Sequence, residues 1–132
     1  VGAMRKVNQI TLEYVKTREQ FGSPIGTNQV IKHRLTDMLI HEEQCKAMSD
    51  MAAMRADLAA DTWGNEQMQT ASATKARIGD AAKFVGEQGI QLHGGIGMTD
   101  EYPVGHYYKR LQTIDKLFGN VDYHLRRFSD AR

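Results

Sequence analysis

Apolar residues recur at helical spacing along almost the whole chain, and this pattern restricts the fold more than any other feature of the sequence. Met4, Val7 and Ile10 begin the first run, at intervals of three residues. Intervals of three or four residues place side chains on one face of an α-helix, whereas a strand needs alternation. No alternating run of useful length occurs in the sequence. The pattern therefore predicts an all-α fold whose amphipathic helices bury their apolar faces against one another.

Glycine, proline and capping residues divide this pattern into segments. The predicted helices cover roughly residues 1–20, 28–60, 66–92, 104–111 and 113–128. Gly22 is predicted to cap the first helix, and either Thr27 or Asn28 is predicted to be the N-cap of the second. Gly64 and Asn65, beside Trp63, mark the break before the third helix. With the last two segments taken as one helix broken at Gly119-Asn120, the sequence predicts a single domain, residues 1–132, folded as an antiparallel four-helix bundle.

Two of these helices carry broad sets of residues that we expect to be buried. In the second helix the set is Ile31, Leu35, Met38, Cys45, Met48, Met51 and Ala52. In the third helix it is Ala71, Ile78, Ala81, Ala82, Val85 and Leu92. The third helix also contains Gly79, Gly86 and Gly89, which are unfavourable inside a helix by about 1 kcal/mol each relative to Ala. We therefore expect these glycines to mark close approach between helices.

Charge and composition exclude several classes of function. The sequence has 17 Lys+Arg against 16 Asp+Glu, so no basic excess is present to bind nucleic acid. No apolar run approaches the ~20 residues needed to cross a bilayer. The single cysteine, Cys45, favours a reducing compartment and a core position. His41-Glu42-Glu43 lacks a second histidine four residues on, so no metal site is predicted, and His33 and His41 are expected to be solvated or at an interface.

Residues 91–103 end the third helix and contain three glycines within four positions, Gly94, Gly95 and Gly97. Such a segment cannot continue a helix, but it allows the backbone to turn tightly and to approach another group closely. Gln91 is one of the polar side chains beside it. The segment is interpreted as a helix end followed by a turn that approaches a ligand; a plain C-cap and loop is the alternative. It is not a dinucleotide-binding fingerprint, because no strand precedes it.

Arg18 lies near the end of the first predicted helix and allows two interpretations. A cation there interacts favourably with the helix dipole. A guanidinium also binds phosphate oxygens through two parallel hydrogen bonds. The other arginines considered, Arg77, Arg110, Arg126 and Arg127, are expected to be solvated or salt-bridged.

Two segments resemble the signatures of one protein family. Residues 14–26 read YVKTREQFGSPIG and are followed by Gln29 and by LTDM at residues 35–38. They resemble the opening of the C-terminal domain of acyl-CoA dehydrogenases. Residues 91–103 read QLHGGIGMTDEYP and resemble the second signature of that family. The order and separation of the segments also match, and the resemblance covers essentially the whole chain.

The resemblance implies FAD as cofactor and a longer chain with a helical, a β and a second helical domain, of which this would be the last. The amphipathic start, Val1-Gly2-Ala3-Met4, which has no cap, also suggests a fragment. Arg18 matches the arginine that binds the FAD diphosphate, often that of a neighbouring subunit. Phe21 and Gln29 match positions beside the adenosine part of FAD.

The glycine-rich segment would complete the cofactor site. Gln91, Gly94 and Gly95 match the turn that approaches the adenine or ribose end of FAD across the subunit interface. The residue types suit these roles, because a planar cation binds diphosphate, glycines permit close approach and amides meet polar edges. Glu101 also matches a common residue of the family and is interpreted as structural.

The catalytic base of the family has no obvious counterpart here. In acyl-CoA dehydrogenases a carboxylate removes the α proton of an acyl thioester while the β hydrogen leaves as hydride to the flavin. In many members the base is the Glu of a Glu-Gly-Thr segment before the last helix. Phe118-Gly119-Asn120 stands in that place, and the phenylalanine cannot accept a proton. The nearby Asp115 and Asp122 are not favoured as the base.

Two functions follow from the resemblance. The first is the C-terminal domain of a flavin-dependent acyl-CoA dehydrogenase, inactive by itself, which supplies FAD contacts and an oligomer interface. The full-length protein would act on a fatty acyl-CoA, pass electrons to an electron-transfer flavoprotein or similar acceptor, and form a dimer or tetramer. The second is a non-catalytic scaffold or partner subunit of a heteromeric acyl-CoA dehydrogenase. The cytoplasm is the expected compartment, with the mitochondrial matrix as the alternative.

Overall fold

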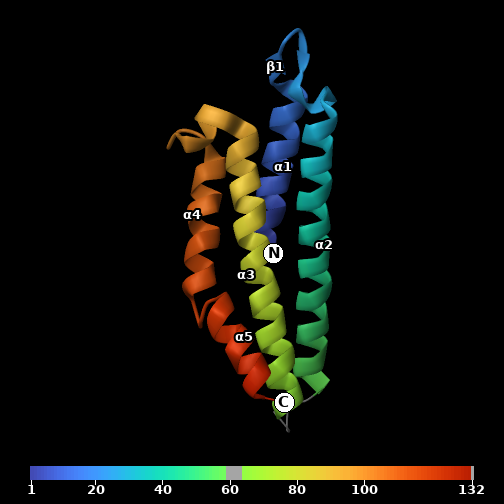
Figure 1. Cartoon of the computed structure of the whole chain (residues 1–132), viewed down its shortest axis with the longest axis vertical. Helices are drawn as coiled ribbons and strands as arrows, with labels where there is room; N and C mark the ends of the chain where they lie inside the picture. The colour runs from blue at the N-terminus through green and yellow to red at the C-terminus, as the bar shows by residue number, and fades with distance from the viewer. Residues whose placement is uncertain (59–63, 132) are drawn as a thin grey trace.

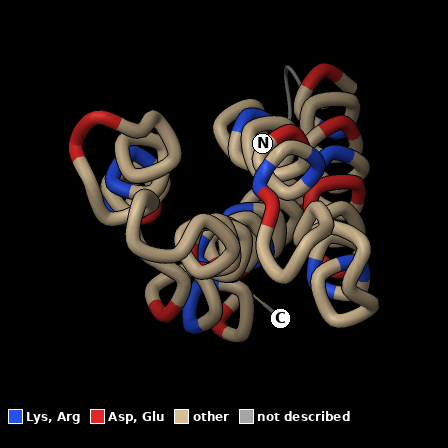
Figure 2. The backbone as a smooth tube through the Cα atoms, turned by 90° about the horizontal axis from the view of Figure 1, so that it is seen from above, with Lys and Arg blue, Asp and Glu red and all other residues tan. Residues whose placement is uncertain are grey.

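The structure is a computed structural model that describes residues 1–58 and 64–131. Its helices pack antiparallel as a bundle with four positions. The helices are α1 (Gly2–Thr17), α2 (Gln29–Leu58), α3 (Asn65–His93), α4 (Pro103–Lys116) and α5 (Val121–Asp130). Successive long helices alternate in direction, and α4 and α5 together occupy the fourth position (Figure 1). The predicted all-α four-helix bundle is confirmed. Seen along the bundle in Figure 2, acidic and basic positions are mixed over the helices, as the near balance of charge implies.

The core lies between α1, α2, α3 and α4. Its buried members are Met4, Val7, Met38, Cys45, Ala81, Ala82, Val85, Leu92, Val104 and Leu111. Cys45 is a buried core residue, as predicted. The prediction for Ala71 is wrong, because that residue is exposed. At the start of α3 the interior positions belong to Thr70 and Ser72 instead, and the Thr70 hydroxyl accepts a hydrogen bond of 2.9 Å from Arg55 of α2.

Three glycines of α3 allow its neighbours to come close, as predicted. A β-carbon built on Gly79 would lie 2.6 Å from a methyl carbon of Val121 in α5. One built on Gly86 would lie 2.8 Å from the ring of Tyr108 in α4. These separations are shorter than real contacts between carbon atoms, so only glycine permits this spacing of the helices.

The connection between α1 and α2 differs from the prediction. Helix α1 ends at Thr17, and a small antiparallel hairpin follows, with β1 (Glu19–Gln20) paired to β2 (Ser23–Pro24) and the 3₁₀ helix η1 (Ile25–Thr27) after it. Phe21 and Gly22 form its turn with φ angles of 55° and 82°. Gly22 therefore permits a hairpin turn with positive φ and is not a helix cap. Asn28 directly precedes α2, and its carbonyl accepts the first backbone hydrogen bonds of that helix.

The boundaries predicted for the last two helices are also wrong. Helix α4 continues through Thr113, whose hydroxyl bonds to the Lys109 carbonyl within the helix, and reaches Lys116. No break therefore occurs near residue 112. The interruption predicted at Gly119-Asn120 is confirmed, because the chain leaves the helix over residues 117–120, where Phe118 and Gly119 both have positive φ angles, 60° and 99°. Asn120 then caps α5 by accepting a hydrogen bond from the Tyr123 N–H.

Some predictions fall on residues that the structure does not describe. The predicted end of the second helix at residue 60 and the position of Trp63 lie within residues 59–63, outside the described residues. Gly64 occupies the N-cap position of α3. Of the helices in residues 1–58 and 64–131, none combines the length and the apolar character that spanning a bilayer would require.

Substitution of Gly89 by alanine tests the close packing. A β-carbon at this position would lie 2.5 Å from Val7 Cγ1 and 3.3 Å from Val104 Cγ2, so α1 and α4 would both have to move. Overpacking typically costs about 1–3 kcal/mol, which exceeds the ~1 kcal/mol that a helix gains when alanine replaces glycine. We therefore expect Gly89→Ala to lower the free energy of unfolding in urea. Gly2→Ala is the control, because nothing lies within 4 Å of its β-carbon; equal values for both variants would contradict the packing.

Candidate functional site

The two segments that carry the predicted site residues lie at the same end of the bundle. The α1–α2 connection and the α3–α4 connection are both at the top of Figure 1, because α1 and α3 run in the same direction. Between α3 and α4 the chain forms a short 3₁₀ helix, η2 (Gly94–Met98). Arg18 and Gly94 are 76 positions apart in the sequence, yet each directly follows a helix that ends here.

Three rings join these segments. The ring centroids of Tyr14 and His93 are 4.4 Å apart, those of His93 and Tyr102 5.0 Å, and those of Tyr14 and Tyr102 5.9 Å. Tyr14 belongs to the last turn of α1, His93 ends α3 and Tyr102 precedes α4. Aromatic pairs in such tilted or edge arrangements contribute about 0.5–1.5 kcal/mol beyond their buried area. We call Tyr14, His93 and Tyr102 the ring cluster; it fixes the end of α1 against both ends of the glycine-rich segment.

His93 is buried and neutral at the centre of the ring cluster. Its Nδ1 lies 2.7 Å from the Gly89 carbonyl oxygen, and because a carbonyl can only accept, Nδ1 donates. Burial lowers the pKa of His93, and the hydrogen bond to Gly89 opposes that shift. Burial also raises the pKa of Tyr102. Both rings therefore stay uncharged around neutral pH.

The first segment presents three exposed side chains. Arg18 follows the last residue of α1, and its backbone N–H bonds to the Tyr14 carbonyl at 2.8 Å, which ties it to the ring cluster. Its guanidinium has no hydrogen-bond or ion-pair partner among the residues that the structure describes. Phe21 projects from the hairpin tip with 103% relative exposure. Gln29, the first residue of α2, is also exposed.

The second segment offers accessible backbone. Gly94 has a φ angle of 62°, which a residue with a side chain rarely adopts, and this conformation ends α3. No heavy atom lies within 4 Å of a β-carbon built on Gly94 or Gly95, so their backbone faces open space. Gln91, one turn earlier, is exposed. The structure therefore places Arg18, Phe21, Gln29, Gln91, Gly94 and Gly95 on the surface at one end of the bundle.

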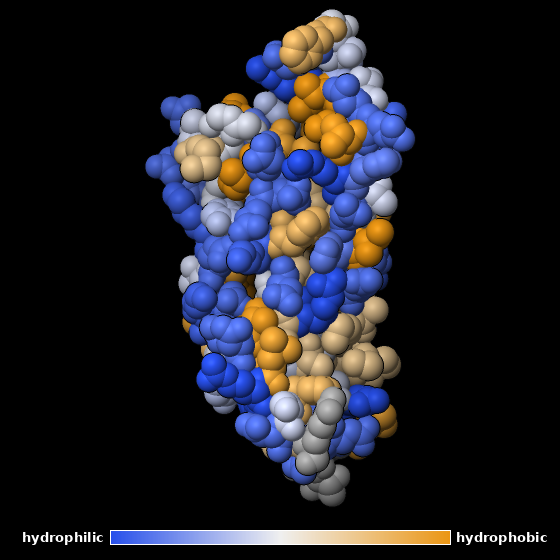
Figure 3. Space-filling model, viewed as in Figure 1, coloured by the Kyte–Doolittle hydropathy of each residue, from blue (hydrophilic) through white to orange (hydrophobic). Residues whose placement is uncertain are grey.

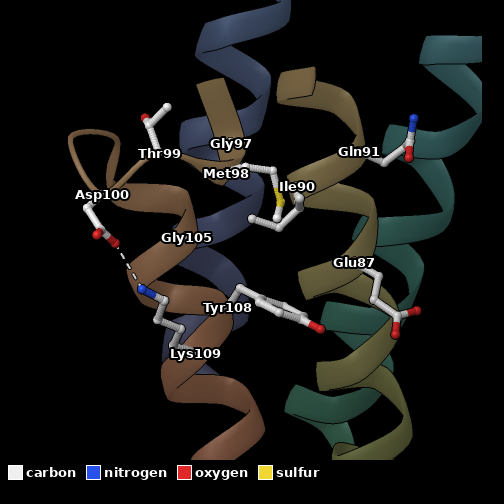
Figure 4. Close-up of a pocket in the computed structure, with 10 residues that line it drawn as sticks. All are labelled: Glu87, Ile90, Gln91, Gly97, Met98, Thr99, Asp100, Gly105, Tyr108 and Lys109. Carbon is white, nitrogen blue, oxygen red and sulfur yellow. Dashed lines mark hydrogen bonds and ion pairs between the residues drawn. The ribbon is translucent and has the colours of Figure 1, made fainter. Parts of the chain in front are cut away.

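A pocket of about 320 Å³ lies beside the glycine-rich segment, between α3 and α4 (Figure 4). The side chains of Ile90 and Met98 meet at its centre, and the Tyr108 ring extends across it from α4. Gln91 lies at its edge, and the ion pair of Asp100 with Lys109, 2.9 Å long, closes the opposite side. The Lys109 ammonium lowers the pKa of Asp100, first through the hydrogen bond and then through its charge. This apolar floor with a polar rim suits a flat ring or an apolar side chain.

Residues 117–120, where the resemblance would place a catalytic base, contain an exposed phenylalanine and no carboxylate. Phe118, in the loop between α4 and α5, is 91% exposed, and its carbonyl accepts a hydrogen bond of 2.9 Å from Nε2 of the buried His124. The Asp115 carboxylate points toward Gly79 of α3 and lies 3.4 Å from the Lys116 ammonium. Asp122 is exposed in the first turn of α5. Neither carboxylate is in the loop that carries Phe118.

The histidines of α2 are not arranged as metal ligands. His33 is exposed, whereas the ring of His41 lies 4.4 Å from that of Phe84 and accepts a hydrogen bond from Arg77. Burial, followed by the charge of Arg77, lowers the pKa of His41. Within residues 1–58 and 64–131, no group of three or more His, Cys, Asp or Glu side chains is placed to hold a metal ion.

Comparison with known proteins identifies the family. The family model described as "Acyl-CoA dehydrogenase, C-terminal domain" matches residues 1–131. The chain belongs to the acyl-CoA dehydrogenase family. The acyl-CoA dehydrogenase IpdE2 of Mycobacterium tuberculosis is 35% identical over 127 residues, which cover 96% of this chain and 37% of IpdE2. The acyl-CoA dehydrogenase FadE34 of the same organism is 39% identical over 127 residues, which cover 96% of this chain and 17% of FadE34. This acyl-CoA dehydrogenase domain thus spans well under half the length of these curated relatives.

Solved structures of the family share the fold. Butyryl-CoA dehydrogenase from Megasphaera elsdenii superposes with a TM-score of 0.88 at 25% identity, over 98% of this chain and 33% of that one. A chain of the ChsE4–ChsE5 complex from Mycobacterium tuberculosis gives 0.88 at 28% identity, over 98% of this chain and 34% of that one. The FAD complex of PigA gives 0.86 at 27% identity, over 98% of this chain and 32% of that one.

Sequence reasoning did not identify the ring cluster or the pocket. Tyr14 follows Ile10 by four residues and so continues the apolar face that Met4, Val7 and Ile10 begin. His93 and Tyr102 belong to the glycine-rich segment, so a signal for the ring cluster is present in both signatures. No local pattern marks Tyr108, which reaches the pocket only because Gly86 lets α4 approach α3.

The neutral state of His93 predicts a dependence of stability on pH. Its pKa in the folded state is lowered from the ordinary value of 6.5, so below that pH the unfolded chain takes up a proton that the fold excludes. His93→Phe keeps a ring against Tyr14 and Tyr102 but removes the titrating nitrogen. Between about pH 7.5 and about pH 5, the native protein should therefore lose more of its free energy of unfolding than this variant.

Urea unfolding at the two pH values measures this difference. Burial also lowers the pKa of His41, so His93→Phe should still lose some stability as the pH falls. His33→Phe is the control, because that residue is exposed, and its loss should match that of the native protein. If the native protein and His93→Phe lost equal amounts of their free energy of unfolding between the two pH values, His93 would not be held neutral by the fold.

Proposed function

We propose that this chain is the C-terminal domain of a three-domain, FAD-dependent acyl-CoA dehydrogenase that removes hydrogen from the α and β carbons of an acyl-CoA thioester. The observation that carries the proposal is the placement of both family signatures at one end of the bundle, joined by the ring cluster. The family match over residues 1–131 and the coverage of only 37% of IpdE2 support a place within a longer protein.

The residues present at this end fit FAD. The exposed guanidinium of Arg18, which has no partner in the described part of the chain, would bind the diphosphate. Phe21 and Gln29 would lie along the adenosine part, where the phenyl ring offers a stacking face and the amide offers hydrogen bonds. The open backbone of Gly94 and Gly95, with Gln91 beside them, would meet the adenine or ribose of a neighbouring subunit's cofactor. The bound flavin supplies the hydride acceptor.

The α proton of the substrate would be removed by a carboxylate outside residues 117–120. Phe118 occupies the position where many members of the family have a glutamate, and its ring cannot accept a proton. The role that we propose for this domain is therefore to bind FAD and to form a subunit interface, with the base supplied by another part of the protein or by a partner subunit.

The wider context is proposed on the same grounds. The full-length protein would act on a fatty acyl-CoA, transfer electrons to an electron-transfer flavoprotein or a similar acceptor, and assemble as a dimer or tetramer. One structural relative is part of the ChsE4–ChsE5 complex, which supports assembly from more than one chain. We propose a cytoplasmic location, supported by the free, buried Cys45 and the bacterial relatives.

Loss of the Arg18 guanidinium tests the cofactor site. We expect Arg18→Ala in the full-length protein to weaken FAD retention about tenfold or more, because a charge-assisted bidentate contact contributes roughly 1.5–3 kcal/mol. The measurement is the ratio of flavin absorbance to protein after dialysis. Arg126→Ala is the control, since this exposed arginine of α5 lies at the opposite end of the bundle. Equal FAD retention in Arg18→Ala and Arg126→Ala would contradict a role of Arg18 in binding FAD.

A second candidate is a non-catalytic partner subunit of a heteromeric acyl-CoA dehydrogenase, which the replacement of the usual glutamate by Phe118 favours. Anaerobic mixing of the purified full-length protein with butyryl-CoA and with a long-chain acyl-CoA separates the two functions. A catalytic protein bleaches its flavin absorbance, whereas a protein that retains FAD without bleaching fits the partner subunit. A full-length protein that retains no FAD would contradict the proposed dehydrogenase.

A further inference from the structure

The loop between α4 and α5 presents an exposed phenyl ring from a backbone conformation that phenylalanine rarely adopts. Phe118 has a φ angle of 60°, in the left-handed region that favours glycine, and it is 91% exposed. Gly119 follows it with a φ angle of 99°. Neither the conformation of Phe118 nor the exposure of its ring stabilises this domain. Residues held in such conformations cluster at active sites and ligand-binding segments, so the loop is a candidate for a role in function.

Helix α3 fixes the start of this loop. The Lys75 ammonium donates hydrogen bonds to the backbone carbonyls of Ile114, at 3.3 Å, and Asp115, at 2.9 Å. Both carbonyls belong to the last turn of α4, where a cation also interacts favourably with the helix dipole. The Leu117 N–H in turn donates to the Ile114 carbonyl at 3.2 Å. The end of α4, from which the loop departs, is therefore held in place.

Helix α5 fixes the rest of the loop. The buried His124 donates through Nε2 to the Phe118 carbonyl at 2.9 Å, because a carbonyl can only accept. The side chain of Asn120 accepts a hydrogen bond from the Tyr123 N–H at 3.0 Å. A β-carbon built on Gly119 would collide with the Tyr123 ring, so the turn itself packs closely on α5. The backbone around Phe118 is therefore held, while its ring is left free.

The surroundings of the loop do not form a broad apolar face. On the side of the molecule shown in Figure 3, hydrophilic side chains cover most of the outer edge along α4, and apolar ones occur there in small groups. One large apolar side chain on an anchored loop suits the wall of a binding site. Such a wall excludes a ligand atom only if the surrounding structure keeps it from moving aside.

The ligand that this wall would contact follows from the proposed function, on which the inference rests. In that assignment Phe118 occupies the position of a carboxylate that would reach the α proton of the acyl thioester. A side chain at this position lies beside the α and β carbons of the substrate. A phenyl ring is apolar and bulkier than a carboxylate, so it fills space that a substituent on either carbon would need.

We propose that Phe118 is a specificity-determining residue that restricts the acyl site to thioesters without branches at the α and β carbons, and that His124 is the positioning residue that fixes it. An unbranched chain carries only hydrogen on these carbons and lies flat against the ring. A methyl branch would overlap with the ring, and the anchored loop could not move aside. A hydrophobic pocket distinguishes ligands that differ by one such group by about 10- to 200-fold.

Binding of enoyl-CoA products tests this selectivity without requiring turnover. Crotonoyl-CoA is unbranched, tiglyl-CoA carries a methyl group on the α carbon, and β-methylcrotonoyl-CoA carries one on the β carbon. We expect the FAD-loaded full-length protein to bind crotonoyl-CoA about tenfold or more tightly than either branched ester, as measured by isothermal titration calorimetry. In Phe118→Ala the three dissociation constants should lie within about threefold of one another, because the wall is gone.

Two further variants separate the ring from its support. His124→Leu removes the donor to the Phe118 carbonyl and should reduce the preference for crotonoyl-CoA although the ring is still present. His124→Gln, whose amide can donate to the same carbonyl, should keep more of that preference. Leu125→Ala is the matched control, because it truncates an apolar side chain of α5 that is 53% exposed and lies outside the loop, and it should leave the preference intact.

Thermal unfolding distinguishes a substrate wall from a ring that packs against another part of the full-length chain. Phe118→Gly relieves the positive φ angle, so the unfolding midpoint should stay the same or rise if the ring faces an open site. A lower midpoint would show that the ring is packed and would overturn the proposal.

The binding measurements can overturn it as well. Equal affinity of the FAD-loaded native protein for the three esters, no binding of any of them, or a preference that Phe118→Ala leaves unchanged would each contradict the role of Phe118. Flavin content, measured on the same samples, tests the proposed dehydrogenase separately. A full-length protein without FAD contradicts that function, whereas unchanged selectivity in an FAD-loaded protein contradicts only the inference about Phe118.

Discussion

Three rings in tilted and edge-on contact, those of Tyr14, His93 and Tyr102, hold together the parts of the chain that carry the two family signatures. Burial keeps His93 uncharged, and its hydrogen bond to the Gly89 carbonyl fixes the ring. Arg18 lies four residues after Tyr14, and Gly94 directly follows His93. A cation and an exposed backbone turn are thereby set at one end of the bundle, although neither is buried in it.

The sequence predicts those parts of the fold that depend on local periodicity. The long helices, the core positions of Met38 and Cys45, and the close packing at Gly79, Gly86 and Gly89 follow from spacing and residue size. The predictions are wrong where tertiary contacts or turn geometry determine where a helix ends. The hairpin at Phe21-Gly22 needs two positive φ angles in succession, which composition alone does not reveal. Thr113 resembles a helix start, but its hydroxyl bonds within α4 and the helix continues.

For the candidate site, sequence identified which residues to consider, and the fold explains how they come together. Residue type and the family resemblance singled out Arg18, Phe21, Gln29, Gln91, Gly94 and Gly95. Their common location depends on α1 and α3 running in the same direction and on the ring cluster between them. The pocket beside the turn depends on Tyr108, whose approach to α3 requires Gly86 and could not be inferred from local sequence. The loop between α4 and α5 exposes a phenyl ring, Phe118, where the resemblance led us to look for a carboxylate.

The central claim is that Arg18 and the Gly94-Gly95 turn hold one dinucleotide cofactor between subunits. The most direct measurement is a crystal or cryo-electron-microscopy structure of the full-length assembly with FAD bound. We predict that the diphosphate lies against the Arg18 guanidinium and that the adenosine part lies against the backbone of Gly94 and Gly95. An assembly in which both segments face bulk solvent, away from every flavin, would contradict the claim.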